Sequence, residues 1–273
     1  TQAQSLRVGE WRDHLSYKSA QDVCEVGNSI YVSTDRALFE YNTTDNSIER
    51  INTLNRLSDT GVSSIEANEN TLIVAYDNGN VDIIRGNKTV NLPDIKNASL
   101  IADKRINHVN IDNNLVYLSC GFGIVVLDLD REEVKDTYFI GEYGAQTNVL
   151  STCMAHNSIY AATNKGLYRA DLNQQNLADY NAWEKLSAHS QSRVDLLESF
   201  NGLLFVNLHG EEYNTDTLYH FDGNNWEVFE QESSNVSIKA SSQELVLTRR
   251  FNVLVYDQEL NRTQTLYSGE FNL

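Results

Sequence analysis

The sequence has little of several residue types that would otherwise narrow its function. It contains one proline, one methionine and three cysteines among 273 residues. The cysteine count is odd, and no Cys-x-x-Cys spacing or Cys/His cluster occurs, so neither a disulfide framework nor a structural zinc site is indicated. Cys24, Cys120 and Cys153 each lie in an apolar, strand-like stretch. We therefore predict buried thiols that act as small hydrophobic side chains.

Basic residues and long apolar runs are also scarce. Lys and Arg number 21 against 38 Asp and Glu, which gives a formal net charge of −17. A chain this acidic is not expected to bind nucleic acid or an anionic membrane surface. No apolar run approaches the roughly 18 residues that a membrane-spanning helix needs. Hydrophobic residues nevertheless make up 41% and aromatic residues 10%, which is enough to build a folded core.

What the sequence does have is an internal repeat. Segments of the type GNSIYVSTDRALFEYN recur, and their apolar anchor pairs are separated by 42, 44, 43, 45 and 41 residues. The copies occupy residues 27–42, 70–84, 113–128, 157–171, 201–210 with 218–224, and 243–257. A repeat of this length is typical of one four-stranded blade of a β-propeller.

Each copy divides into four short strands. A β-branched strand comes first, and we place these strands at residues 23–26, 62–66, 106–111, 149–155, 194–199 and 236–240. The second and third strands alternate with period two, which predicts half-buried strands, and the fourth strand is more variable. No amphipathic helix is evident. We therefore predict an all-β fold, a β-propeller with six complete blades.

The ends of the chain leave the blade number of the intact protein open. Trp11, Trp183 and Trp226 precede the next first strand by 12, 11 and 10 residues, so we expect them to share one position in a fourth strand. The sixth copy has its own fourth strand at 262–267. Either a seventh blade is incomplete here, with residues 269–273 as its entrance, or the ring has six blades and the Trp11 strand joins the last one.

Five segments of the sequence resemble known families. NRLSDTGVSSI, at 55–65, resembles the joint of two-component-regulator propeller repeats. GEWRDHLSY, LIVAYDNGNVDII, INHVNIDNNLVYLSCGFGIVVLDL and EVKDTYFIG together are similar to the N-terminal propeller of PorZ-type proteins, accessory components of the type IX secretion system. The similarity is strong from residue 9 to about 141, and beyond that only the blade pattern persists.

The resemblance to PorZ-type proteins also implies a domain organisation, a location and a ligand. It implies that residues 1–273 form one propeller domain, the first of a larger extracytoplasmic protein whose secretory signal is not in this sequence. It also implies binding to an anionic lipopolysaccharide, and work beside a sortase-like peptidase. No individual functional residue is carried over, because such propellers have no catalytic motif.

The loops on one face of a propeller usually hold the ligand site. The turns between the second and third strands contain Asp35, Arg36, Asn78, Phe122, Lys165, Arg249 and Arg250, and the connections between blades contain Asp59, Lys104, Arg105, His189 and Arg193. Arg and Lys bind phosphate and carboxylate groups well. Our candidate ligand-binding residues are therefore Arg36, Lys104, Arg105, Phe122, Lys165, Arg193, Arg249 and Arg250, unless these are simply solvated turn residues.

Other motifs give weaker signals. The segment at 209–217, HGEEYNTDT, is the longest insert of this kind and is either functional or a plain surface loop. The segment at 77–82, DNGNVD, superficially resembles a calcium loop but lacks its closing Glu, and Asn-Gly favours a hairpin turn. We expect no cofactor and no metal.

Three functions remain open at this stage. We favour a non-enzymatic propeller that binds an anionic glycan or lipopolysaccharide together with a secretion-system protein. A periplasmic glycan-sensing domain of a hybrid two-component regulator is the alternative. A propeller lyase or glycosidase would need paired carboxylates or a His/Glu metal site near the axis, and nothing in the sequence supports that.

Overall fold

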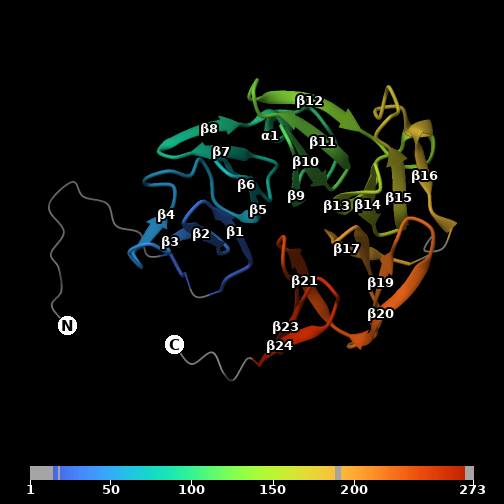
Figure 1. The fold of residues 1–273 in the computed structure, drawn as a ribbon. Helices are drawn as coiled ribbons and strands as arrows, with labels where there is room; N and C mark the ends of the chain where they lie inside the picture. Colours follow the sequence, from blue (N-terminus) through green and yellow to red (C-terminus); the bar gives the residue numbers. More distant parts are fainter. Residues whose placement is uncertain (1–14, 18, 188–191, 268–273) are drawn as a thin grey trace, which may run out of the picture. The chain divides into compact units, whose positions relative to one another are not determined.

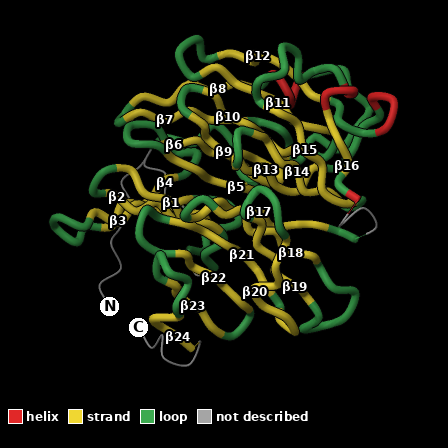
Figure 2. Tube along the Cα trace, turned by 45° about the vertical axis from the view of Figure 1, so that its right-hand side comes forward, coloured by secondary structure: helices red, strands yellow, loops and turns green. Residues whose placement is uncertain are grey.

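The protein is an all-β molecule. The computed structural model describes residues 15–17, 19–187 and 192–267, and within them strands β1–β24 form six four-stranded antiparallel sheets (Figure 1). The described helical segments are short and include α1 (Asp94–Asn97), η1 (Glu142–Gly144) and η2 (Tyr180–Ala182) (Figure 2). None of the helices in these ranges is long and apolar enough to cross a membrane.

Each sheet pairs its four strands in the order of the sequence. This up-and-down order, repeated six times, defines six blades of a β-propeller, so the predicted fold is confirmed. The chain divides by its internal contacts into an N-terminal unit, residues 1–116 and 127–135, and a C-terminal unit, residues 117–126 and 136–273.

The first two blades lie in the N-terminal unit. Blade 1 consists of β1 (Asp22–Val26), β2 (Ser29–Ser33), β3 (Leu38–Asn42) and β4 (Ile48–Ile51). Blade 2 consists of β5 (Val62–Ala67), β6 (Leu72–Tyr76), β7 (Val81–Arg85) and β8 (Lys88–Leu92). Blade 3, whose strands are divided between the units, consists of β9 (Ile106–Asp112), β10 (Leu115–Cys120), β11 (Gly123–Asp128) and β12 (Glu133–Tyr138).

The last three blades lie in the C-terminal unit. Blade 4 consists of β13 (Val149–Ala155), β14 (Ser158–Thr163), β15 (Gly166–Asp171) and β16 (Trp183–Lys185). Blade 5 consists of β17 (Val194–Phe200), β18 (Leu203–Leu208), β19 (Asp216–Phe221) and β20 (Trp226–Ser233). Blade 6 consists of β21 (Asn235–Ala240), β22 (Leu245–Arg249), β23 (Asn252–Tyr256) and β24 (Arg262–Tyr267).

The predicted first strands agree with β1, β5, β9, β13, β17 and β21 to within one residue at either end. Trp183 and Trp226 each open a fourth strand, which confirms their shared position. The strand predicted around Trp11 and the proposed entrance at 269–273 lie outside the described residues. Six complete blades are therefore established, and the incomplete seventh blade stays a prediction.

Apolar side chains hold successive blades together inside each unit. In the N-terminal unit, Tyr31 and Leu38 of blade 1 pack in one buried cluster with Ile65, Val74 and Tyr76 of blade 2. In the C-terminal unit, one cluster joins blades 4 and 5 and a second joins blades 5 and 6. Packing one sheet against the next removes far more apolar surface from water than an isolated four-stranded sheet could.

This packing corrects the expected burial of the middle strands. All five residues of β6 and all six of β14 are buried, so these strands are covered on both faces instead of being half-buried. Alternation of exposed and half-buried residues occurs instead along parts of the first and last strands, such as β1 and β12. A strand between two neighbouring blades has no solvent face, and its sequence reads as a continuous apolar run.

A β-bulge recurs near the start of the first strand. The register shifts after Val62, Val149, Val194 and Asn235, the first residues of four such strands. A bulge turns the side chain of the extra residue in a new direction. In β17 the extra residue is Asp195, whose carboxylate lies 3.0 Å from His209 Nδ1.

The three cysteines form no disulfide with one another, and two of them are buried as predicted. Cys120 and Cys153 are buried, whereas Cys24 is only half-buried. Burial raises the pKa of the Cys153 thiol, and the Glu198 carboxylate raises it further. The thiolate form of Cys153 is therefore disfavoured at neutral pH.

Candidate functional site

The long insert between β18 and β19 is an ordered loop. The Gly210 amide donates to Asp216 Oδ1 at 2.9 Å, and the Asn214 amide donates to Ser234 Oγ at 2.9 Å. Thr215 Oγ1 donates to the Glu212 carbonyl at 2.7 Å, which closes the tip of the loop. These bonds hold Tyr213 at the tip with 62% of its surface exposed.

The turn between β22 and β23 meets this loop. The Arg250 guanidinium carbon lies 5.7 Å from the centroid of the Tyr213 ring and 5.4 Å from that of the Phe251 ring. Phe251 is 55% exposed, and Arg250 is also exposed. We call Tyr213, Arg250 and Phe251 the arginine–aromatic cluster. Stacking on rings limits the motion of a guanidinium while leaving its N–H groups free to bind.

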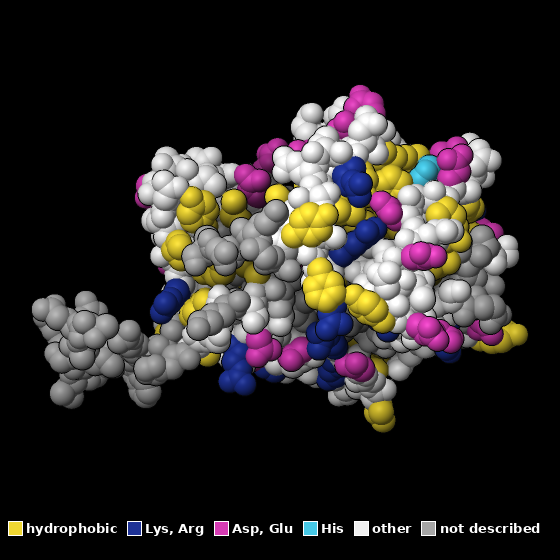
Figure 3. Space-filling model, turned by 90° about the horizontal axis from the view of Figure 1, so that it is seen from below, with side chains coloured by type: hydrophobic (Ala, Val, Ile, Leu, Met, Phe, Trp, Pro, Cys, Tyr) yellow, Lys and Arg dark blue, Asp and Glu magenta, His cyan; other side chains and the backbone are white. Residues whose placement is uncertain are grey.

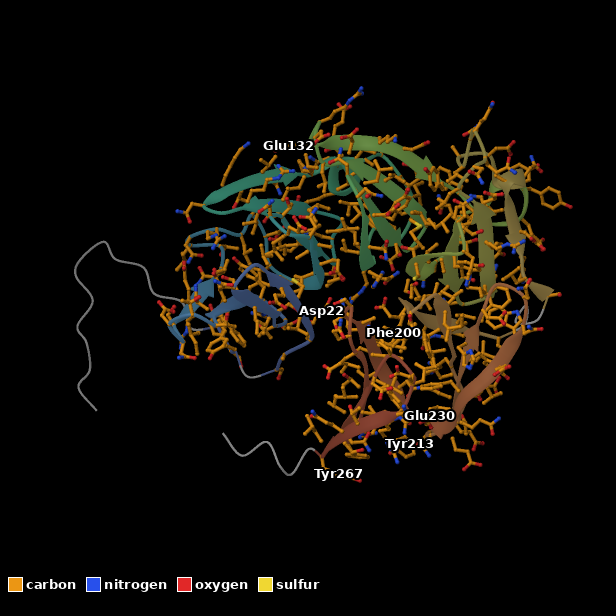
Figure 4. All side chains as sticks on the ribbon, viewed as in Figure 1. Asp22, Glu132, Phe200, Tyr213, Glu230 and Tyr267 are labelled. Carbon is orange, nitrogen blue, oxygen red and sulfur yellow. The ribbon has the colours of Figure 1, made fainter. Side chains whose placement is uncertain are left out.

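The pictures give the setting of this cluster. Figure 4 labels Tyr213 and Glu230, which both belong to blade 5. Figure 3 shows a face on which hydrophobic side chains adjoin basic ones, with acidic side chains nearby. On a chain with a formal net charge of −17, such a local group of basic and aromatic side chains is a departure from the average surface.

Arg249, the neighbour of Arg250, has a structural role. Its side chain is 20% exposed and lies 3.4 Å from Glu230 Oε2, and its Nε donates to Asn235 Oδ1 at 3.2 Å. Glu230 in turn accepts a hydrogen bond from the Tyr256 hydroxyl at 2.6 Å. Burial raises the pKa of Tyr256, and the bond to Glu230 adds to it. The charge of Arg249 is thus already paired with a carboxylate of the neighbouring blade.

Arg193 also has a carboxylate partner. Its Nε lies 3.9 Å from Asp195 Oδ2, and His209 Nδ1 lies 3.0 Å from the same oxygen. Asp195 accepts a hydrogen bond from Asn207 Nδ2 at 2.8 Å. Burial raises the pKa of Asp195, although the bond from Asn207 and the charges of His209 and Arg193 act in the opposite direction.

Two further candidates of the C-terminal unit differ in accessibility. Lys165 is exposed in the hairpin between β14 and β15, and its backbone amide donates to Thr163 Oγ1. Phe122 is only 3% exposed, and its ring centroid lies 6.2 Å from that of Phe139. Phe122 therefore packs in the core and offers no ring to a ligand, contrary to the expectation from its place in a turn. His189 lies outside the described residues.

The candidates of the N-terminal unit lie beside carboxylates or serve the backbone. Arg36 Nε lies 3.5 Å from Asp35 Oδ2, at the edge of a hollow of about 420 Å³ that Asp59 and Asp77 also line. Lys104 Nζ donates to the carbonyls of residues 96 and 98, at the end of α1. Arg105 is exposed. A hollow with three carboxylates and one guanidinium does not favour an anion.

Sequence reasoning missed one ion pair of this hollow. Lys96 Nζ lies 2.6 Å from Asp59 Oδ2, and Asn78 Nδ2 donates to the same oxygen at 2.7 Å. Burial alone would raise the pKa of Asp59, but the hydrogen bonds from Lys96 and Asn78 outweigh it and the pKa is lowered. The separation of 37 residues between Asp59 and Lys96 left no local signal for this pair.

The segment at 77–82 is a hairpin turn, as favoured from its Asn-Gly pair. It joins β6 to β7, with Gly79 in the left-handed region at φ +85°. Asp82 is buried and accepts hydrogen bonds from the Tyr76 hydroxyl, the Ser58 amide and Asn91 Nδ2. Among the described residues, no group of three or more His, Cys, Asp or Glu side chains could hold a metal ion.

These features define a β-propeller whose loops carry a cation flanked by exposed rings. The family model described as TSS9, PorZ, N-terminal beta-propeller domain matches residues 30–184, more than half of the chain. The protein belongs to the family of PorZ N-terminal β-propeller domains.

Solved structures agree with this fold. PorZ of Porphyromonas gingivalis, described as an essential bacterial surface component of the type IX secretion system, matches with a TM-score of 0.76 and 21% identity over 91% of this chain. The extracellular domain of a putative one-component system of B. thetaiotaomicron matches with a TM-score of 0.66 and 14% identity over 89%. The computationally designed protein Ika8 matches with a TM-score of 0.59 and 12% identity over 91% of this chain and 87% of its own.

The chain spans only part of the natural proteins that it matches. It covers 33% of the PorZ structure and 34% of the one-component system structure. At these identities the likeness shows the fold alone. No protein with a curated description matches the sequence.

Proposed function

We propose that this chain is a non-catalytic binding domain of a PorZ-type accessory protein of the type IX secretion system, located outside the cytoplasm. In this proposal the arginine–aromatic cluster binds an anionic ligand, for which a phosphate- or carboxylate-bearing lipopolysaccharide is our candidate. Membership of the PorZ propeller family supports the role as a binding domain. The printed description of PorZ as a bacterial surface component supports the location.

The proposal rests on the observation that Arg250, unlike three other candidate arginines, lies beside aromatic rings and not beside a carboxylate. Arg36, Arg193 and Arg249 each have a carboxylate within 4 Å, whereas Arg250 has no ion-pair partner among the described residues. Exposed rings lie over its guanidinium instead. A planar, preorganised guanidinium binds phosphate or carboxylate through two parallel hydrogen bonds.

The ligand must overcome the charge of the rest of the protein. With a formal net charge of −17, long-range repulsion slows the approach of an anion, and added salt screens both this repulsion and the local attraction. Lys165 and Arg105, which are exposed and have no ion-pair partner in the described part of the chain, are secondary candidates. They lack the flanking rings that hold Arg250.

The test compares Arg250→Gln with Arg131→Gln. Arg131 is an exposed arginine that already lies close to Asp128 and Glu133, so it is a matched control for the loss of one positive charge. Binding is measured by biolayer interferometry to purified lipopolysaccharide and to the same material after chemical dephosphorylation. We expect Arg250→Gln to weaken binding about tenfold, as the loss of a charged hydrogen bond predicts. Equal binding by both variants would refute the site.

The likeness to a sensor's extracellular domain favours a second candidate function. A glycan-sensing domain of a hybrid two-component regulator would use the same loops but recognise oligosaccharides that need no charge. The Arg250→Gln variant separates the two, because it weakens binding of an anionic ligand in the first case and leaves binding of an uncharged oligosaccharide unchanged in the second. The dephosphorylated material then shows whether phosphate or carboxylate is the anion recognised.

A further inference from the structure

A second hollow lies in the C-terminal unit, in loops other than those of the arginine–aromatic cluster. It has a volume of about 390 Å³ and is bordered by η1, η2, β15 and β16. Its walls include Tyr143, Tyr168, Tyr180 and Trp183. Pockets of a few hundred Å³ lined by aromatic side chains and a few polar groups are typical of small-molecule sites.

The loop that carries Tyr143 is held by its own backbone. The Gly141 amide donates to the Ala145 carbonyl at 3.1 Å, and the Gly144 amide donates back to the Gly141 carbonyl at 2.9 Å. Tyr143 lies in the left-handed region, with φ +57° and ψ +29°, and is 88% exposed. A bulky residue rarely adopts this conformation, and such strain concentrates at ligand sites. The strain here holds a large ring in water, where it has no packing role.

Trp183 and Tyr180, which also line the hollow, are held in place by contacts of their own. Trp183 is buried, and its indole N–H donates to the Leu177 carbonyl at 2.9 Å. The Tyr180 ring packs close to Gly144, and this contact links the two short helical turns η1 and η2. The Tyr180 and Trp183 rings therefore stand in place before a ligand arrives, which reduces the entropy lost on binding.

One acidic and one basic side chain line the hollow together with these aromatic rings. The Glu142 carboxylate and the Lys185 ammonium both line it, and neither has an ion-pair partner in the part of the chain that the structure describes. Lys185 Nζ lies 5.9 Å from the centroid of the Tyr168 ring. Burial raises the pKa of Tyr168, and the Glu142 carboxylate adds to this, so the hydroxyl stays protonated. The hollow thus offers hydrogen-bond acceptors and donors beside aromatic faces.

We propose that this hollow binds the pyranose ring of a neutral sugar. A pyranose has an apolar face of C–H bonds, which carry partial positive charge and stack on the negative face of an aromatic ring. Its rim of hydroxyls both donates and accepts hydrogen bonds, as Glu142 and Lys185 together require. A purely apolar occupant would cover these two charged groups without pairing them, at a large desolvation cost.

The test uses sugars without charge. Methyl glucoside, methyl galactoside, methyl mannoside and N-acetylglucosamine are titrated against the protein, with sorbitol as an acyclic polyol of similar hydrogen-bonding capacity. Binding is followed by saturation-transfer NMR and by the fluorescence of Trp183, which is assigned with Trp183→Phe. We expect at least one cyclic sugar to bind saturably at millimolar concentration and sorbitol not to bind.

The variants separate a binding role from a structural one. Tyr143→Asn removes the ring while keeping a residue that tolerates the left-handed conformation, so the fold is retained. It is expected to weaken sugar binding about tenfold, and Tyr180→Ala to do the same. Ile101→Asn, at an apolar side chain that is 99% exposed and belongs to neither proposed site, is the control and leaves the affinity unchanged.

Two results would overturn the proposal: no cyclic sugar binds, or the affinity is the same in Tyr143→Asn and Tyr180→Ala as in the unmodified protein. Because the probes are uncharged, Arg250→Gln is expected to leave their binding intact. The failure of this proposal is therefore distinguishable from the failure of the anionic site.

Discussion

Tyr76→Phe removes one oxygen atom from the core of the N-terminal unit, and its effect can be worked out from the contacts. Tyr76 and Asp82 are both fully buried, with no exposed surface. The Tyr76 hydroxyl donates to Asp82 Oδ2 at 2.6 Å, and the Ser58 amide donates to the same oxygen at 2.8 Å. Burial, followed by the charge of Asp82, raises the pKa of Tyr76, so the hydroxyl always carries its proton.

The magnitude follows from the charge of the acceptor. A hydrogen bond to a charged group contributes about 1.5–3 kcal/mol. Asp82 keeps the Ser58 amide and Asn91 as donors, and the ring of residue 76 keeps its packing, so we expect a loss of about 2 kcal/mol in the free energy of unfolding. For a chain of this size that corresponds to a fall in Tm of about 4–8 °C.

The assay is thermal and urea unfolding of Tyr76→Phe beside Tyr138→Phe. Tyr138 is also buried, and in the described residues its hydroxyl makes no hydrogen bond, so the same substitution there should cost less than about 0.5 kcal/mol. If Tyr76→Phe and Tyr138→Phe lose the same stability, the hydrogen bond from Tyr76 to the buried Asp82 carboxylate does not stabilise the second blade, and the prediction is refuted.

Two other predictions concern the N-terminal hollow and one of its turns. Because the hydrogen bonds from Lys96 and Asn78 lower the pKa of Asp59, the ion pair stabilises the fold above the ordinary pKa of about 3.9, and this stabilisation is lost as pH falls through the lower folded-state value. Lys96→Met should therefore cost about 0.5–1 kcal/mol at pH 7 and almost nothing at strongly acidic pH. Urea unfolding across pH measures this, and a cost that does not vary with pH, or one matched by Lys165→Met, would contradict it. In the second prediction, Gly79→Ala is compared with Gly202→Ala by thermal unfolding. Both glycines have positive φ, but a Cβ at Gly79 would lie 3.0 Å from the Lys104 carbonyl oxygen, whereas one at Gly202 meets nothing within 4 Å. Gly79→Ala should cost about 1 kcal/mol more than Gly202→Ala, and equal costs would show that the backbone conformation alone decides.

Much of the fold follows from local patterns in the sequence. The anchor pairs at Ile30, Leu72, Val116, Ile159, Leu204 and Leu245 all lie in the second strands of their blades, because every blade needs the same apolar residues at the same depth. The full burial of β6 could not be predicted from period two, since it depends on a neighbouring blade that covers the second face. The bulge at Asp195 has no signal in spacing, because it changes the pairing by a single residue.

The candidate site was less predictable from the sequence. A turn position predicts exposure for Lys165 and Arg250, which the structure bears out, but it cannot show which cations already have partners. Arg249 and Arg250 are adjacent in sequence, yet Arg249 lies beside Glu230 of the neighbouring blade and Arg250 lies near two exposed rings. These partners come from another blade and another loop, so only the tertiary arrangement distinguishes the two arginines.

Because the three thiols differ in burial, the rates at which they are alkylated report how often the fold opens locally. We expect a membrane-permeant alkylating reagent to modify the half-buried Cys24 fastest. The buried Cys120 and Cys153 react only after neighbouring sheets have separated enough for the reagent to reach them. Mass spectrometry of the slowly modified sites would time the opening of the C-terminal sheets without an attached label, and a ligand that tightens those sheets would appear as a slower modification of Cys153.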